Sequence, residues 1–358
     1  MTHARYLPVL ELRPAEMLAL SELPNKDKDS FVPLFRLRPW SSSHSLDKSI
    51  GRLQKAYGDR RAFLEVAEAE YVDPDKRRAV HGELDALRDP SRGYHNWIEY
   101  LKDPAHQHFI PCLQFGGTPA DFLMQVRSLY ALGRGILARL ERPSSMAVDA
   151  VARVVGENSD QGRRVTFVLD YGKQREGFAK EEQSVSALIR IVERSCPDAE
   201  VAISASSFPD GFVGITEQNI FERVLYDRLR SRFPNLIFSD RGSARAEKQL
   251  GGGGLPAPRV DYAKKTSWHF YRQYLPVSTA FKGYQEQALA VISDARVWDK
   301  RLKLWACQMI EKTAAGDSEG GISSPNRSTA VRINLHLHRQ ANFYDEAAFL
   351  DTDEDWID

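Results

Sequence analysis

A short apolar segment that ends in a charged or hydroxyl-bearing residue recurs eight times before residue 245, with an amphipathic stretch after each copy. Most of these segments start about 25 to 36 residues apart, close to the ~30 residues of one strand–helix unit. The pattern predicts an α/β fold, a (β/α)8 TIM-like barrel, whose strand C-terminal ends share the face that carries active sites. The predicted strands span residues 6–11, 31–36, 62–65, 109–114, 135–139, 165–170, 201–204 and 236–240.

The chain divides by pattern into a barrel and two following segments. We expect the barrel over residues 1–245, with a helical insertion after the third strand at about 68–108 that is either a solvated decoration or a lid or partner surface. Residues 246–345 then read as a C-terminal α+β extension packed at the barrel mouth, beginning with the glycine run 251–254. An acidic tail covers residues 346–358 and includes Trp356, which could dock it.

Composition limits the partners that this chain can attract. Its 49 basic residues balance 49 acidic ones, so no global field draws nucleic acid, and any polyanion site must be local. No apolar run reaches the ~20 residues of a membrane helix, and a predicted strand follows the first residues directly, so we expect neither a membrane segment nor a secretory leader. Three widely spaced cysteines fit reduced thiols, and the expected compartment is the cytoplasm.

Carboxylates end four of the predicted strands, and Asp170 and Asp240 follow the most apolar of them. Glu11 and Glu65 are the weaker pair of candidates. A barrel would bring such groups together, where they could act as a catalytic acid/base pair or bind a divalent cation such as Mg²⁺. The alternative is that they form ion pairs with neighbouring arginines. The sequence names no cofactor, and the metal requirement stays unknown.

Arginines also gather at or just after the strand ends. Because the planar guanidinium binds phosphate or carboxylate through two hydrogen bonds, they predict an anionic ligand, such as a nucleotide; ordinary ion pairing in the loops is the alternative. Ser206 ends the seventh strand, where barrels often bind phosphate; a structural turn is the alternative. The predicted ligand-binding residues are Arg13, Arg38, Arg139, Ser206, Arg241 and Arg272.

Two histidines, His336 and His338, alternate with apolar residues over 331–338. We interpret this segment as a strand that presents both histidines on one face, where they could serve as catalytic residues or meet a metal or phosphate; simple solvent exposure is the alternative. Before it lies an aromatic strand at 266–272, which could stack bases or bury its rings against the barrel. Two helices are expected at about 280–295 and 298–313.

The order of several motifs resembles the "beta protein" family associated with T-even phages and bacteria. The resemblance rests on residues 6–20 with 31–35, on Ser206-Ser-Phe-Pro209, Ser239-Asp-Arg-Gly242 and Trp268-His-Phe-Tyr-Arg272, and on the closing Asn334-Leu-His-Leu-His338. It implies phages and mobile, defence-like loci as a setting and no particular reaction. Where that family usually has Lys-x-Lys-x-x-Glu after its first strand, this chain has Glu11, Arg13 and Glu16, so only the last residue carries over.

Two kinds of function fit these observations. The first is a hydrolase or lyase of phosphate esters, acting on a nucleotide or nucleic acid in phage–host conflict, with Asp170, Asp240, His336 and His338 as catalytic residues. The second is a non-catalytic module of a phage-defence assembly that holds an anionic small molecule or a protein partner at the barrel mouth.

Overall fold

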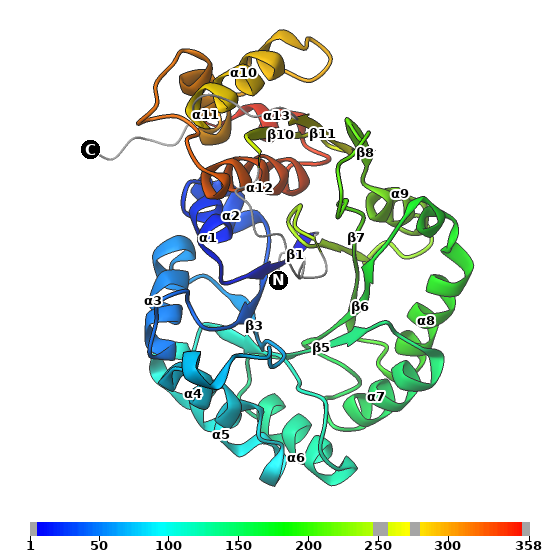
Figure 1. Cartoon of the computed structure of the whole chain (residues 1–358). Coiled ribbons are helices and arrows are strands. Elements are labelled where there is room, and N and C mark those ends of the chain that lie inside the picture. Colours follow the sequence, from blue (N-terminus) through cyan, green and yellow to red (C-terminus); the bar gives the residue numbers. More distant parts are fainter. Residues whose placement is uncertain (1–5, 246–256, 273–279, 353–358) are drawn as a thin grey trace.

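A computed structural model describes residues 6–245, 257–272 and 280–352, and shows an eight-stranded parallel barrel ringed by helices (Figure 1). The strands are hydrogen-bonded in the order β4-β3-β2-β1-β9-β7-β6-β5, and a bridge between Cys112 and Leu137 brings the β4 end against β5. The predicted (β/α)8 fold is therefore confirmed. The barrel strands are β1 (Tyr6–Glu11), β2 (Leu34–Leu37), β3 (Ala62–Val66), β4 (Phe109–Pro111), β5 (Ile136–Glu141), β6 (Val165–Lys173), β7 (Glu200–Ser206) and β9 (Ile237–Asp240).

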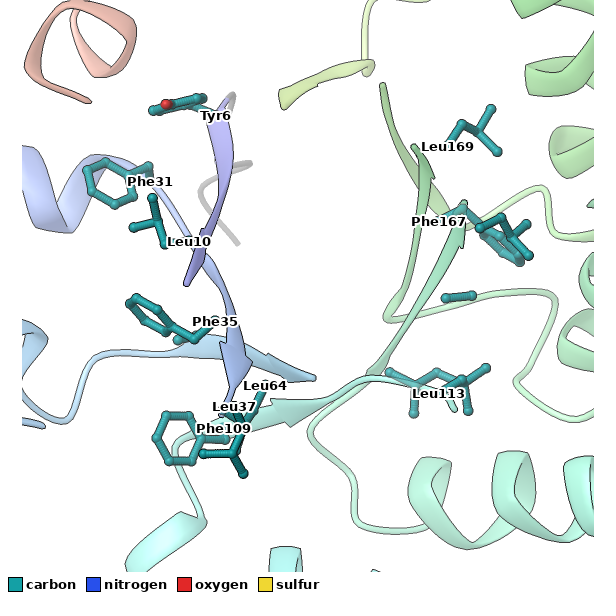
Figure 2. Close-up of a cluster of buried hydrophobic side chains, with 14 of the residues drawn as sticks. Tyr6, Leu10, Phe31, Phe35, Leu37, Leu64, Phe109, Leu113, Phe167 and Leu169 are labelled. Carbon is teal, nitrogen blue, oxygen red and sulfur yellow. The ribbon is translucent and has the colours of Figure 1, made fainter. Parts of the chain in front are cut away.

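Side chains along each strand alternate between the barrel interior and the helix layer, as a pleated strand requires. The interior holds a small apolar cluster that includes Leu7, Phe63 and Val168. The outward side chains form the larger core with the helices; Figure 2 shows members such as Leu10 and Phe167 pointing away from the barrel axis. The charged in-facing residues Arg36, Glu65, Arg139 and Asp170 lie toward the carboxyl ends of their strands, so a charged layer forms there.

The helices between the barrel strands start where the sequence signals predict. Pro14 opens α1 at a position whose missing N–H costs no hydrogen bond, and Thr118 caps α6 by accepting from the Asp121 N–H. The segment after β3 forms two α-helices that continue the outer ring between β3 and β4. The helices are α1 (Pro14–Ser21), α2 (Asn25–Ser30), α3 (Leu46–Tyr57), α4 (Ala79–Arg88), α5 (Ser91–Lys102), α6 (Pro119–Tyr130), α7 (Ser145–Glu157), α8 (Glu182–Ser195) and α9 (Phe221–Leu229), with 3-10 turns η1 (Pro74–Lys76), η2 (Pro104–His106) and η3 (Glu176–Lys180).

One helix, α12 (Pro325–Ala341), fills the place of the eighth barrel helix although it lies far along the chain from β9. Figure 1 shows it in the ring between α9 and α1. Its Ile333 and Leu337 belong to the barrel core, whereas Val331 and Leu335 belong to a second core. The strand that we predicted at 331–338 is thus wrong: apolar residues alternate there because opposite sides of a buried helix meet two cores.

The remaining C-terminal elements form a module, hereafter the C-terminal module, on the outer side of α12. A three-stranded antiparallel sheet in the order β10-β11-β8 and three helices share an aromatic core with Trp268 and Phe270. The predicted aromatic strand is therefore confirmed, and most of its rings are buried. These elements are β8 (Glu217–Asn219), β10 (Arg259–Ala263), β11 (Ser267–Arg272), α10 (Ala280–Ser293), α11 (Trp305–Ala314) and α13 (Glu346–Leu350). The expected glycine loop at 251–254 and the docking role of Trp356 lie outside the described residues.

Candidate functional site at the barrel mouth

A cavity of about 730 Å³ opens at the carboxyl ends of the strands, between the barrel and α12. Eight arginines and six carboxyl groups line it, far more charge than a packed interior tolerates without pairing. How these charges pair decides what the cavity can bind. The charged lining residues are Glu11, Arg13, Glu16, Arg36, Arg38, Glu68, Glu70, Glu141, Arg142, Asp170, Arg241, Arg245, Arg259 and Arg332.

The strand ends carry a continuous chain of ion pairs, which we call the strand-side network. On the β1 to β3 side, Arg36 Nη1 lies 2.8 Å from Glu11 Oε1, and Arg36 Nε lies 3.2 Å from Glu65 Oε2. Arg38 extends the chain outward by pairing with Glu11 and, at 2.8 Å, with Glu70. Acidic and basic residues thus alternate from strand to strand, and each charge has an opposite neighbour.

The same network continues across β5, β6 and β9. Arg139 pairs with Glu65 at 2.7 Å, with Asp170 at 2.7 Å and with Glu141, while Arg241 Nη2 lies 2.6 Å from Asp170 Oδ2. Burial raises the pKa of Asp170, but the Arg241 and Arg139 guanidinium groups and the Gly172 N–H outweigh it, so the pKa falls below its usual value. Asp170 therefore stays ionised at neutral pH and is committed to two arginines.

A second group of charges, the module-side cluster, lies where the C-terminal module meets the cavity. The fully buried Asp261 carboxylate lies 2.9 Å from Arg332 Nη1, 3.0 Å from Arg272 Nη2 and 3.7 Å from Arg259 Nε. Arg332 and Arg272 also lie over the rings of Phe208 and Phe212. Asp261 thus faces three guanidinium groups, two of which, Arg259 and Arg332, line the cavity.

Two arginines of this cluster, Arg332 and Arg272, have lowered pKa values. Burial lowers the pKa of Arg332 and the neighbouring Arg259 guanidinium lowers it further, while Asp261 opposes the shift only in part. Burial lowers the pKa of Arg272 in the same way, again with Asp261 opposing it only in part. A lowered pKa of a cation means that its charge is poorly compensated, so an added anion would stabilise this cluster.

Glu16 stands apart from the other carboxyl groups of the mouth. It lies in the first turn of α1, is 4% exposed, lines the cavity, and its Oε2 atom has no hydrogen-bond partner within the described structure. Burial and repulsion from Glu11 raise its pKa to about 8, although Arg13 opposes the shift. Glu16 is therefore largely protonated at neutral pH, an unusual state for a carboxyl group beside a cavity.

The structure brings most of the predicted ligand-binding residues to this site. Arg13, Arg38 and Arg241 line the cavity with Asp170, and Arg139 lies against them through its pair with Asp170. Arg272 joins the module-side cluster. Ser206 lies deeper: its hydroxyl donates to the Ala244 carbonyl at 2.8 Å and accepts from the Phe208 N–H, which is a structural turn.

The three remaining predicted catalytic residues lie outside the cavity lining. Asp240 points outward from β9 toward α12, where its carboxylate accepts from the Tyr6 hydroxyl at 2.9 Å and lies 2.6 Å from His336 Nε2. The expectation that Asp240 converges with Asp170 fails because successive residues of β9 alternate between barrel and helix layer. Burial raises the pKa of Asp240, but His336, Gly242 and Tyr6 outweigh it and the pKa is lowered.

His336 and His338 hold α12 in place. His338 Nδ1 lies 2.6 Å from the buried Asp27 carboxylate of α2, and its Nε2 lies 2.9 Å from the Phe349 carbonyl. Both histidines are fully buried in helix α12, so the predicted strand and the solvent-exposed alternative are both wrong. Along the described chain, no group of three or more His, Cys, Asp or Glu side chains has the arrangement of a metal site.

Sequence reasoning missed Arg259, Asp261 and Arg332 and gave Glu16 no chemical role. A signal for Asp261 existed: it is a lone acidic residue between Val260 and Tyr262, flanked two positions away by an arginine. For Arg332 no signal existed while its helix was interpreted as a strand.

Comparison with known proteins shows to which family the chain belongs. A model of the Beta protein family matches residues 6–342, so the chain belongs to that family. It is 26% identical over 344 residues to "Protein beta" of Enterobacteria phage P4, covering 94% of this chain and 92% of that protein. The matched relative comes from phage P4, and the comparisons do not support an association with T-even phages. The crystal structure of the 3-dehydroquinate dehydratase from Aquifex aeolicus VF5 is 13% identical with a TM-score of 0.35, over 70% of this chain and 93% of that one.

Among helices in the described ranges, none combines the length and the apolar character needed to cross a bilayer.

Proposed function

From the barrel of a Beta protein family member and its charged mouth, we propose that this chain binds a phosphate-bearing ligand in the barrel-mouth cavity. One observation carries the proposal: three arginines of the module-side cluster share the single carboxylate of Asp261, and two of them line the cavity. The strand-side network is already paired, so it offers a rigid floor and little free charge.

A phosphate group suits this cluster in charge and in geometry. Three guanidinium groups against one carboxylate leave two positive charges, which a terminal phosphate dianion would neutralise. Each guanidinium can present two parallel N–H groups to phosphate oxygens. The Nε atoms of Arg259 and Arg272 are buried without a hydrogen-bond partner in the described part of the chain, so Asp261 does not satisfy all the donors of this cluster.

Such binding is compatible with two functions, one catalytic and one not. We favour a phosphate-ester hydrolase or lyase acting on a nucleotide or nucleic acid in phage–host conflict, because a protonated carboxyl group, Glu16, faces the same cavity. The second candidate is a non-catalytic receptor or adaptor in a phage-defence assembly. It is supported by the commitment of Asp170 to Arg139 and Arg241, which leaves it unsuited to bind a metal or take up a proton. The free, buried cysteines support a reducing cytoplasmic setting.

Native mass spectrometry followed by calorimetric titration tests the binding proposal. Purified protein should carry or accept inorganic phosphate, adenosine monophosphate or a short oligonucleotide. Replacing Arg259→Gln should weaken phosphate binding about 10- to 150-fold, since a charge-assisted hydrogen bond contributes about 1.5–3 kcal/mol. The matched control is Arg153→Gln on α7, whose side chain is 62% exposed and pairs with Asp149 outside the cavity. Failure of the unaltered protein to bind any of these probes would refute the proposal.

A further inference from the structure

We infer that Glu16 is the proton donor of the barrel mouth, the general acid that protonates the leaving oxygen of a bound phosphate ester. This assignment rests on the proposed phosphate site and adds a reaction to it. Its basis is placement: Glu16 is the deeply buried carboxyl group of the cavity lining that no arginine pairs with in the described structure.

Two other carboxylates of the cavity lining, the half-buried Glu11 and the buried Asp170, already pair with arginines. Glu11 pairs with Arg36 and Arg38, and Asp170 pairs with Arg139 and Arg241. The lowered pKa of Asp170 keeps this group charged at neutral pH, so it donates no proton. Glu16 instead lines the cavity and keeps one buried oxygen, Oε2, without a hydrogen-bond partner in the described structure.

The charged groups around Glu16 come from each element that packs near it. Glu11 at the end of β1 repels its ionised form, while Arg13 at the start of α1 and Arg38 after β2 attract it. Arg332 of α12 lines the same cavity, and the α3 cations Lys48 and Arg52 line a separate surface depression. Burial outweighs the attraction, and the pKa of Glu16 rises to about 8. At neutral pH the group therefore holds a proton and can give it up.

The reaction that this placement supports is hydrolysis of a phosphate ester, with water as the second reactant. A water oxygen bonds to phosphorus and the bond from phosphorus to the ester oxygen breaks. The Glu16 proton passes to that ester oxygen, giving an alcohol. One water proton remains on the released hydrogen phosphate, and the other restores the Glu16 carboxylic acid. The arginines of the module-side cluster hold the phosphoryl oxygens and stabilise the charge that develops on them.

Turnover measurements with adenosine monophosphate, phenyl phosphate and a dinucleotide diester test the assignment. We expect Glu16→Gln to keep phosphate affinity and to lower turnover by about 10²–10⁴-fold, the usual contribution of a positioned proton donor. Glu193→Gln, on an exposed position of α8, is the matched control and should be unchanged. Equal turnover in Glu16→Gln and unaltered protein would overturn the role, as would binding of these probes without any turnover. Absence of phosphate binding would instead refute the proposed function.

Thermal melting gives a readout that needs no substrate. The folded pKa of Glu16, about 8, lies above its unfolded value near 4.5, so between these pH values the unfolded chain releases a proton that the folded chain keeps. Stability of the unaltered protein should therefore fall, relative to Glu16→Gln, as the pH rises from about 5 to 8, and the difference should level off above that. A difference that is flat over this range, as in Glu193→Gln, would show that Glu16 is ionised and would overturn the assignment.

Discussion

The two sides of the barrel mouth use the same residue types in different proportions. In the strand-side network, arginines and carboxylates alternate around the barrel, and Arg139 alone meets three acidic partners. In the module-side cluster, three arginines meet the one carboxylate of Asp261. Charge balance therefore separates the part of the mouth in which every charge is paired from the part at which we propose that a ligand binds, and arginine content alone would not distinguish them.

The largest effect should come from breaking the strand-side network. Arg139→Met leaves Glu65 and Asp170 short of a partner in a buried setting, where the Arg139 side chain is only 4% exposed. Removing one partner of a buried pair costs about 3–5 kcal/mol, because the remaining charge is uncompensated. Urea denaturation should show this loss, whereas Arg153→Met, at an exposed pair, should change the free energy of unfolding by less than about 1 kcal/mol. A small loss at Arg139 would mean that both sides serve the ligand.

An intermediate effect is expected on the module side from Asp261→Asn. Losing the shared carboxylate should lower the free energy of unfolding by about 2–3 kcal/mol, since three guanidinium groups then repel one another. Added phosphate should restore much of that stability, because a ligand at 100 times its Kd contributes about 2.7 kcal/mol. Melting curves with and without phosphate would measure both parts. If phosphate raises the melting temperature of Arg139→Met just as strongly, the contrast between the two sides fails.

The smallest effect should come from salt, which acts on the two sides unequally. Raising sodium chloride screens the attraction between an incoming phosphate and the module-side arginines and should weaken phosphate binding several-fold. The strand-side pairs are mostly buried and are screened less, so the free energy of unfolding without ligand should move by less than about 1 kcal/mol. Titration and urea denaturation at low and high salt compare the two directly. Equal sensitivity of both quantities would contradict the division.

Much of the barrel could be predicted because its signals are local. Each strand is a short apolar run, and helix starts such as Thr118-Pro119 carry their own capping residues. The strand ends also predicted that arginines and carboxylates would meet at one face, and Asp170, Arg139 and Arg241 do so. The sequence shows which charged residues lie on one face of the barrel. It does not show which arginine contacts which carboxylate, so the ion pairs themselves could not be predicted.

The parts that could not be predicted depend on contacts distant in sequence. Polar residues of α12 can be buried because they pair with residues that are distant in the sequence. His336 pairs with Asp240 of β9, and His338 pairs with Asp27 of α2. These contacts cannot be seen in the sequence, so the alternation of apolar and polar residues indicated a strand. The length of the segment was the better signal, since 17 residues without glycine follow the capping Ser324, and Pro325 takes the first helical position. The raised pKa of Glu16 likewise comes from burial that only the assembled mouth produces.

The position of α12 in the chain also sets the order in which the protein can finish folding. Barrel strand β9 ends at Asp240, yet the helix that covers it ends only at Ala341. During synthesis at about 5–20 residues per second, on the order of 10 s pass between the two. In that interval Tyr6, Leu10 and Phe238 lack part of their cover, so the nascent barrel presents an apolar seam to chaperones. A chain that stops before residue 325 would keep that seam and would aggregate although all eight strands were made.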